Sequence, residues 1–184
     1  MKYSLPAVAL TMGEPAGIGG EITFKAWRDH RHQLDPFFVI DDPERLKNLS
    51  GILGWKIDIC KIATPSEALI SFQKSLPVLP VGEVVGTTLA QPSPKNLKAI
   101  ICSIDKAVTL ARSGEVSAVV TNPIHKSTLY DLGFAFPGHT EYLAHLANVT
   151  SKPVMMLASD NLKVVAITRH VSVLEAVRIL SPEL

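Results

Sequence analysis

The stretch AVALTMGEPAGIGGEITFKAWRDHRHQLDPFFVID, residues 7–41, contains the pattern that decides the fold. It starts with a short apolar run (7–12), passes through a glycine-rich loop into an amphipathic segment (20–29), and ends in a second apolar run (37–41). Short apolar runs predict buried strands, and the amphipathic segment between them predicts a helix. A strand, a helix and a second strand in this order are typical of a parallel sheet.

The same alternation continues along the chain. Further strands are predicted at 56–62, 118–124, 153–159 and 163–168, and further helices at 43–50, 65–73, 95–113, 139–148 and 172–180. The stretch 76–96 carries four prolines and two glycines, which predicts a turn-rich connection or an extended excursion. The sequence therefore predicts an α/β fold with three layers, α/β/α, around a mainly parallel sheet.

The composition is that of a globular protein, with 47% hydrophobic and 19% charged residues among 184. A net charge of +1 gives no reason to expect nucleic acid or a membrane surface as a partner. No apolar run approaches the roughly 20 residues that span a bilayer. Cys60 and Cys102 lie in separate apolar runs, which favours free thiols in a reducing compartment. We therefore expect a cytoplasmic protein.

Ligands of open α/β sheets bind at the carboxyl ends of strands, so the loops that follow the strands are the candidate binding sites. The loop MGEPAGIGGE (12–21) has closely spaced glycines but lacks both the dinucleotide fingerprint and the P-loop pattern. A tight strand–helix connection and a ligand-binding loop are both compatible with it, and Glu14 is its candidate polar residue. The segment TNPIHKSTLYDLG (121–133) favours a solvated turn and a short helix ended by Gly133, although its Lys or His could face an anion.

The segment FAFPGHTEYLAHLA (134–147) places His139, Thr140 and Glu141 where a helix is predicted to begin. Such residues either cap the helix or help its free N–H groups to hold an anionic ligand. His170 follows the last predicted strand and is a candidate metal ligand or acid–base group. Spacing alone supports an α/β enzyme with a small anionic substrate.

Three stretches, LTMGEPAGIGGE (10–21), VVTNPIHKSTLYDLGFAFPGHTEYLA (119–144) and VMMLASDNLKVVAITRHVSVLEAV (154–177), resemble the 4-hydroxythreonine-4-phosphate dehydrogenase family of vitamin B6 biosynthesis. The resemblance implies an isocitrate/isopropylmalate dehydrogenase-like fold, in which two α/β/α lobes flank the active-site cleft of a homodimer. It also implies NAD or NADP as cofactor and a divalent metal such as zinc, magnesium or cobalt.

By the same resemblance, His139 and Thr140 bind the small phosphorylated amino-acid substrate and His170 is a metal ligand. Catalytic and cofactor-binding residues are left unassigned. The implied reaction oxidises 4-phosphooxy-L-threonine to 2-amino-3-oxo-4-phosphonooxybutanoate, which decarboxylates to 3-amino-2-oxopropyl phosphate. The sequence departs from the family at Arg169, where a threonine commonly precedes the metal histidine.

Family members are considerably longer than this chain. We therefore expect residues 1–184 to be the N-terminal part of a two-lobed enzyme that is incomplete at its C-terminus, with a possible crossover between lobes near 121–138. Alone, the 184 residues are expected to be inactive. The alternatives are a family paralogue that oxidises a related phosphorylated or hydroxylated acid, and an inactive α/β fragment that only binds.

Overall fold

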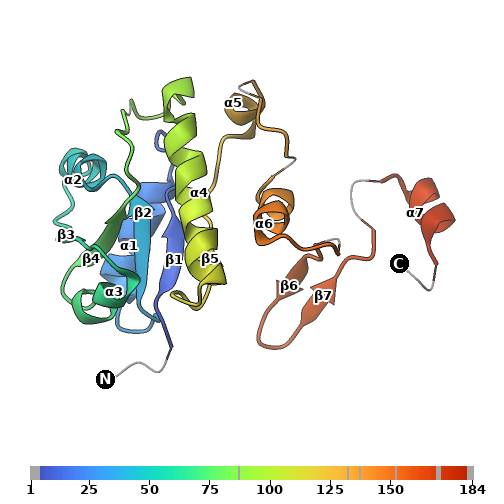
Figure 1. Cartoon of the computed structure of the whole chain (residues 1–184), viewed down its shortest axis with the longest axis horizontal. Coiled ribbons are helices and arrows are strands. Elements are labelled where there is room, and N and C mark those ends of the chain that lie inside the picture. Colours follow the sequence, from blue (N-terminus) through green and yellow to red (C-terminus); the bar gives the residue numbers. More distant parts are fainter. Residues whose placement is uncertain are drawn as a thin grey trace. The chain divides into compact units, whose positions relative to one another are not determined.

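Five parallel strands form the sheet at the centre of the first of two compact units, Met1–Ala147 and Asn148–Leu184 (Figure 1). The computed structural model describes residues 5–86, 88–131, 133–136, 138–151, 153–168 and 171–181. The strands are β1 (Val8–Thr11), β2 (Phe37–Asp41), β3 (Ile59–Lys61), β4 (Leu76–Pro80) and β5 (Val119–Val120), in the spatial order β3-β4-β2-β1-β5. Each strand pairs in parallel with its neighbours, which confirms the predicted sheet.

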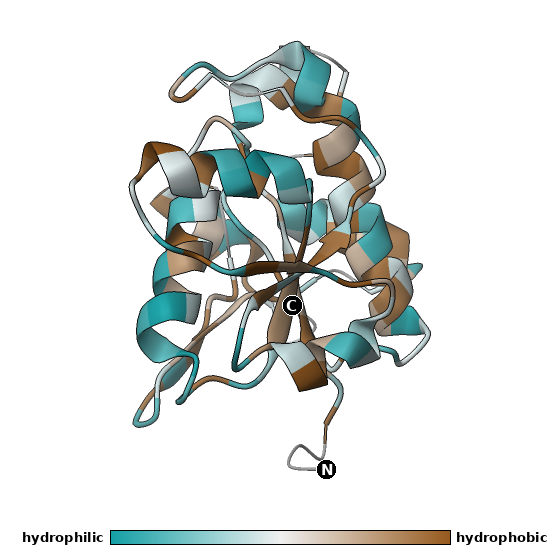
Figure 2. Cartoon of the chain, turned by 90° about the vertical axis from the view of Figure 1, so that its left-hand side faces the viewer, coloured by the Kyte–Doolittle hydropathy of each residue, from teal (hydrophilic) through white to brown (hydrophobic). Residues whose placement is uncertain are grey.

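Helices connect these strands and follow the last of them. They are α1 (Gly19–His30), α2 (Pro43–Ile52), α3 (Pro65–Ser71), the 3₁₀ turn η1 (Pro94–Asn96), α4 (Leu97–Arg112), α5 (Lys126–Asp131) and α6 (His139–Ala147). Local sequence fixes two of their starts: Asp42 accepts a hydrogen bond from the N–H of Glu44, and Thr64 and Glu67 form a capping box before α3. Hydrophilic and hydrophobic residues alternate along the helices (Figure 2).

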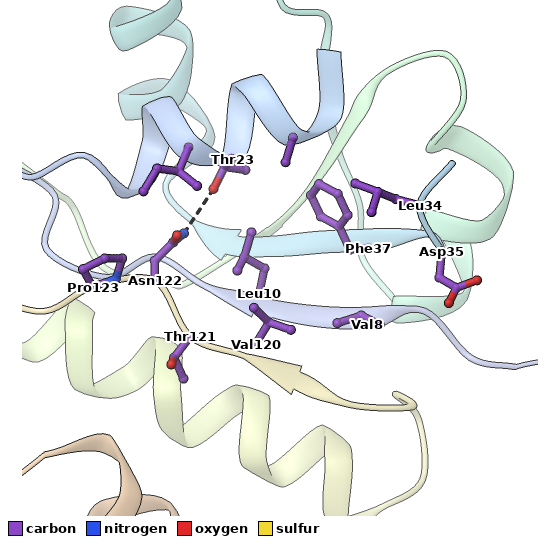
Figure 3. Close-up of a pocket in the computed structure, with 12 residues that line it drawn as sticks. Val8, Leu10, Thr23, Leu34, Asp35, Phe37, Val120, Thr121, Asn122 and Pro123 are labelled. Atoms are coloured by element: carbon purple, nitrogen blue, oxygen red, sulfur yellow. Dashed lines mark hydrogen bonds between the residues drawn. The ribbon is translucent and has the colours of Figure 1, made fainter. Parts of the chain in front are cut away.

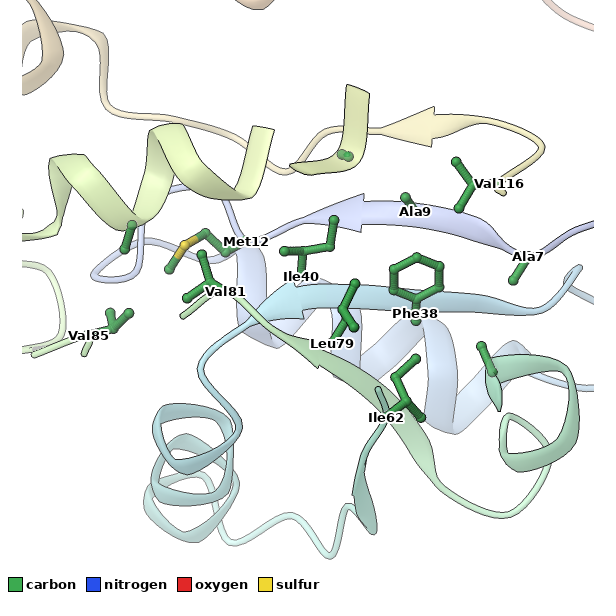
Figure 4. Close-up of a cluster of buried hydrophobic side chains, with 13 residues drawn as sticks. Ala7, Ala9, Met12, Phe38, Ile40, Ile62, Leu79, Val81, Val85 and Val116 are labelled. Carbon is green, nitrogen blue, oxygen red and sulfur yellow. The ribbon is translucent and has the colours of Figure 1, made fainter. Parts of the chain in front are cut away.

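The helices cover both faces of the sheet and make three layers. Phe37 and Val39 of β2 point to one face, where they pack with Phe24 of α1 and Leu46 of α2. On the opposite face, a second cluster joins strand residues to α3 and α4 (Figure 4). Its members include Ala9, Phe38, Ile40, Leu79, Ala68, Ala99 and Ala107. Neighbouring residues of β2 thus serve opposite faces, as the strand geometry requires.

Strand β4 occupies the start of 76–96, where the sequence predicts a turn-rich connection or an extended excursion and not a paired strand. Leu76 donates its N–H toward β3, to Asp58, and Val81 donates toward β2, to Asp41, so successive N–H groups alternate between the two neighbours. By this alternation Pro77 faces β2 before their pairing begins at Val78, and Pro80 faces β3 beyond its last paired residue. Both prolines occupy positions where no ladder bond is lost, so an inner strand tolerates them.

The segment after β5 packs on the outer side of α4. Leu129 of α5 and Tyr142 of α6 join Ile100 and Ile104 of α4 in a third apolar cluster. The Tyr142 hydroxyl donates a 2.5 Å hydrogen bond to Asp105 of α4. Near the other end of α6, a guanidinium N–H of Arg112 donates to the Leu146 carbonyl. These contacts hold α6 against α4 at both of its ends.

The second unit contains a hairpin of β6 (Met156–Ala158) and β7 (Lys163–Val165), followed by helix α7 (Val173–Ile179). The two strands pair antiparallel, which corrects the expectation that they belong to a parallel sheet. The physical reason is the short link between them: only residues 159–162 join the strands, and the N–H of Ser159 donates to the Leu162 carbonyl, which leaves Asp160 and Asn161 at the tip of the turn. A parallel pair needs a crossover of about a dozen residues or more.

No helix among the described residues combines the length and apolar character needed to cross a membrane.

Candidate functional site

The loop after β1 is built around a buried carboxylate. Glu14 is only 5% exposed, and its Oε1 accepts a hydrogen bond from the N–H of Ala16. The buried guanidinium of Arg45 forms an ion pair with Asp41 at the end of β2 and donates to the Pro15 carbonyl. Burial alone would lower the pKa of Arg45, but the charge and hydrogen bonds of Asp41 outweigh it and raise that pKa. Glu14 and Arg45 therefore fix the shape of this loop.

Two glycines of the same loop allow a close approach between backbones. A Cβ on Gly13, whose φ is +69°, would lie 2.6 Å from the Pro123 carbonyl oxygen, and one on Gly19 would lie 2.9 Å from that of Met12. Asn122, which follows β5, donates from Nδ2 to the Thr11 carbonyl and the Thr23 hydroxyl (Figure 3). The glycines are thus accounted for by contact with the chain after β5, which favours the tight connection over a ligand-binding loop.

The turn and the short helix that the sequence predicts after β5 are both present. The Nδ1 atom of His125 hydrogen-bonds the Thr128 hydroxyl at 2.7 Å, and α5 begins at Lys126. The N–H groups of Gly133 and Phe134 donate back to the carbonyls of Tyr130 and Leu129, with Gly133 at a φ of +85°. This is the glycine-ended short helix that the sequence predicts.

His139 and Thr140 are the first two residues of α6, which confirms their predicted placement at a helix start. The Nε2 atom of His139 is buried and has no hydrogen-bond partner among the described residues. Burial, and to a smaller extent the charge of Lys126, hold the pKa of His139 below its usual value of 6.5. The imidazole is therefore neutral at pH 7, and the hydrogen-bonding capacity of its buried Nε2 is not used by the described residues.

Lys126 comes close to this helix start, and the sequence pattern did not associate the two. Its Nζ lies 3.6 Å from the position that a Cβ on Gly138 would occupy, and Glu141 Oε2 lies 3.8 Å from the same point. Gly138 comes twelve positions after Lys126, and neither periodicity nor motif spacing links them. The sequence does contain one relevant signal: α5 and α6, which a short connection joins, both begin with polar residues.

His170, the predicted metal ligand, and Arg169 lie outside the described residues. Among the residues that are described, no three His, Cys, Asp or Glu side chains come together as a metal site. The ring of His145 packs against Phe136, with 4.9 Å between ring centroids and 40° between ring planes.

An apolar groove of about 470 Å³ lies beside β1 and β5, on the face of the sheet that carries α1 (Figure 3). It is lined by Val8, Leu10, Ile22, Thr23, Ala26, Leu34, Asp35, Phe37, Val120, Thr121, Asn122 and Pro123. It offers no cluster of charged groups and so is not suited to an anionic substrate.

A family model described as pyridoxal phosphate biosynthetic protein PdxA matches residues 33–184. The chain is 45% identical to a 4-hydroxythreonine-4-phosphate dehydrogenase of Methylorubrum populi, over 96% of this chain and 52% of that protein. It is 42% identical to a 4-hydroxythreonine-4-phosphate dehydrogenase of Bradyrhizobium diazoefficiens, over 100% of this chain and 56% of that protein. A crystal structure of a 4-hydroxythreonine-4-phosphate dehydrogenase from Burkholderia phymatum matches with a TM-score of 0.87 and 33% identity, over 98% of this chain and 55% of that one. The chain spans about half the length of the curated relatives it matches.

Proposed function

Because the chain belongs to the family of pyridoxal phosphate biosynthetic protein PdxA, we propose that it forms part of an oxidoreductase with 4-hydroxythreonine-4-phosphate dehydrogenase activity. The overall reaction converts the secondary alcohol of 4-phosphooxy-L-threonine to a ketone and reduces NAD or NADP. The product, 2-amino-3-oxo-4-phosphonooxybutanoate, is a β-keto acid that loses carbon dioxide to give 3-amino-2-oxopropyl phosphate. The names of the relatives support the substrate and the pathway.

The observation that carries the proposal is the unsatisfied imidazole at the start of α6. A buried ring nitrogen without a partner among the described residues is costly unless something binds it, and His139 stands at a helix start, where the first N–H groups have no partner within the helix. Thr140, the next residue, adds a hydroxyl that donates or accepts. An oxyanion of the substrate can accept hydrogen bonds from the His139 imidazole, from the helix N–H groups and from the Thr140 hydroxyl at the same time.

His139 then binds and orients the substrate as a neutral ring. Its depressed pKa means that it does not need a proton from solvent to act as a donor, since the neutral tautomer with hydrogen on Nε2 donates one bond. Thr140 and the first N–H groups of α6 complete the contacts. The phosphate end of the substrate is the group we assign to this helix start.

The described residues by themselves do not form a three-ligand metal site, and the glycines of the β1–α1 loop do not leave open space for a cofactor. Asn122 fills the space beside these glycines. The proposal therefore takes NAD or NADP and a divalent metal (zinc, magnesium or cobalt) from the family resemblance, with His170 as the matched ligand. When bound, the metal would acidify the substrate hydroxyl and the nicotinamide would accept the hydride.

The remaining parts of the proposal concern assembly and compartment. A homodimer is proposed from the family resemblance. A cytoplasmic location is supported by Cys60 and Cys102, which are both free thiols, as expected in a reducing compartment.

The test follows nicotinamide absorbance when the complete protein meets 4-phosphooxy-L-threonine, a divalent metal and NAD or NADP. We expect turnover that a chelator abolishes. The change His139→Ala should raise KM by a factor on the order of 10 to 100, because a hydrogen bond to a charged group is lost. His32→Ala, which removes an exposed histidine after α1, is the matched control and should leave KM unchanged.

Turnover with another phosphorylated or hydroxylated acid, but none with 4-phosphooxy-L-threonine, would identify a paralogue. Binding of substrate without any turnover would identify a protein that only binds. An unchanged KM in His139→Ala would remove His139 from the substrate site.

A further inference from the structure

We propose that Lys126 is a specificity-determining residue of the substrate site, where its ammonium selects a phosphorylated substrate over one that lacks the phosphate. The inference rests on the proposed function, since it assumes that an anion binds at the start of α6. It adds a charged residue from a different helix, α5, to the pair His139 and Thr140.

Packing explains why Lys126 reaches this point. Leu129 of α5 is 1% exposed and Tyr142 of α6 is 7% exposed, and both are buried against α4 in the same apolar cluster. Each of these residues lies three positions after the polar residue at its own helix start, Lys126 or His139. In a helix, residues three apart share a face, so the two anchored helices bring their polar starts to one place.

The distances place the Lys126 ammonium directly over Gly138, the residue before α6. Both Nζ and Cε lie within 3.7 Å of the position that a Cβ on Gly138 would take. Gly138 itself is buried, whereas the Lys126 side chain is exposed and its ammonium remains open to solvent and to a ligand. A phosphate group that accepts a hydrogen bond from His139 thus meets the ammonium next to it.

The ammonium is available to a ligand. Among the acid side chains that the structure describes, none lies within the 4.0 Å of Lys126 Nζ that defines an ion pair. Glu141 is the described carboxylate that borders the same glycine, at 3.8 Å from the Cβ position. With His139 neutral, the charges of Lys126 and Glu141 add up to zero. An anionic ligand group is therefore attracted only where it lies closer to Lys126 than to Glu141.

Charge type also argues for phosphate. A lysine supplies a point charge with three donors, which suits a phosphate dianion that already has a neutral imidazole and a hydroxyl as neighbours. A substrate with a plain hydroxyl in that place would leave the ammonium unpaired and would gain little from it. Lys126 therefore discriminates between the phosphorylated and the unphosphorylated substrate, while His139 and Thr140 orient the bound substrate.

The test compares Lys126→Met, which keeps the length of the side chain without its charge, with Lys126→Arg, which keeps the charge. In the complete enzyme, Lys126→Met should lower kcat/KM for 4-phosphooxy-L-threonine by a factor on the order of 10 to 100, mainly through KM. The value for 4-hydroxy-L-threonine should stay unchanged, and Lys126→Arg should recover most of the loss. Lys74→Met, at an exposed lysine in the loop before β4, is the matched control.

A second measurement is independent of turnover. Inorganic phosphate should shift the NMR signals of the His139 ring in the unaltered protein, and this response should weaken by a similar factor in Lys126→Met. Removal of the ammonium should also raise the pKa of His139 toward its usual value, while burial keeps part of the depression.

The outcomes separate the two proposals. If the enzyme fails to oxidise 4-phosphooxy-L-threonine but phosphate binding still depends on Lys126, the proposed function is wrong and the role of Lys126 stands. If phosphate leaves the His139 signals unchanged, or shifts them equally in Lys126→Met, the role of Lys126 is overturned. Equal losses of kcat/KM for both substrates would overturn it as well, because they would indicate a general structural role.

Discussion

At the residue scale, the molecule separates residues that shape the site from residues that are free to act in it. Glu14 attracts attention in the sequence because it follows a strand, yet its carboxylate is used by the backbone of its own loop. His139 attracts attention for a similar reason, and its ring nitrogen remains unpaired among the described residues. Sequence alone cannot separate these cases, because the difference lies in which polar atoms the fold satisfies.

Gly13 provides a residue-scale test of the close approach between the β1–α1 loop and the chain after β5. Gly13→Ala should destabilise the protein by more than about 1 kcal/mol, because it adds a clash with the Pro123 carbonyl to the strain of a positive φ. Gly114→Ala is the matched control: its φ is also positive, at +77°, but nothing lies within 4 Å of the added Cβ. Chemical denaturation measures both, and equal losses would mean that the Pro123 contact has no cost.

At the element scale, the sequence predicts helices and exposed turns better than it predicts partners. The apolar face of 95–113 and the glycine at 133 suffice to predict α4 and the end of α5. Strand β4 is missed because Pro77 and Pro80 are strong turn signals, and only the pairing pattern shows that neither removes a ladder bond. The antiparallel pairing of β6 and β7 could have been predicted, since Asp160 and Asn161 are turn formers between two adjacent strands.

The attachment of α6 to α4 gives a prediction at this scale. Burial and the hydrogen bond to Asp105 raise the pKa of Tyr142, so its hydroxyl remains a donor across the physiological pH range. Tyr142→Phe should cost about 1–2 kcal/mol of stability and speed amide exchange in α6 more than in α4. Because α6 begins with His139, KM for the phosphorylated substrate should rise as well.

The control for this change is Ser71→Ala, which removes a hydroxyl that hydrogen-bonds the Glu67 carbonyl within α3. It should leave both α6 exchange and KM near their original values. If Tyr142→Phe speeds exchange uniformly through the first unit, the hydroxyl stabilises the whole fold and does not hold α6 in particular.

At the scale of the whole molecule, the two units differ in how completely they bury their apolar residues. The first unit has three apolar clusters around its sheet. In the second unit no described residue is buried, and the relatives are about twice as long as this chain. The length difference agrees with the expectation from the sequence that the 184 residues form part of a longer enzyme.

The β6–β7 hairpin also leaves its apolar side chains poorly buried. Met156 pairs with Val165 on one face of the hairpin, and Leu157 pairs with Val164 on the other. All four side chains are more than 40% exposed, so neither face of the hairpin is covered. A two-stranded hairpin is at best marginally stable alone in water, and apolar side chains on both faces favour association.

The 184-residue chain alone should therefore self-associate, and sedimentation or size-exclusion measurements over a range of concentrations will detect it. Leu157→Lys places a charge on one face of the hairpin and should reduce association, because the buried contact would have to desolvate an ammonium. Val165→Lys tests the opposite face in the same way, and the exposed Ile70→Lys of α3 is the control outside the hairpin. If the unaltered chain stays monomeric at all concentrations, the predicted self-association is wrong. An effect of Ile70→Lys as large as those of the hairpin changes would instead place the associating surface on the first unit.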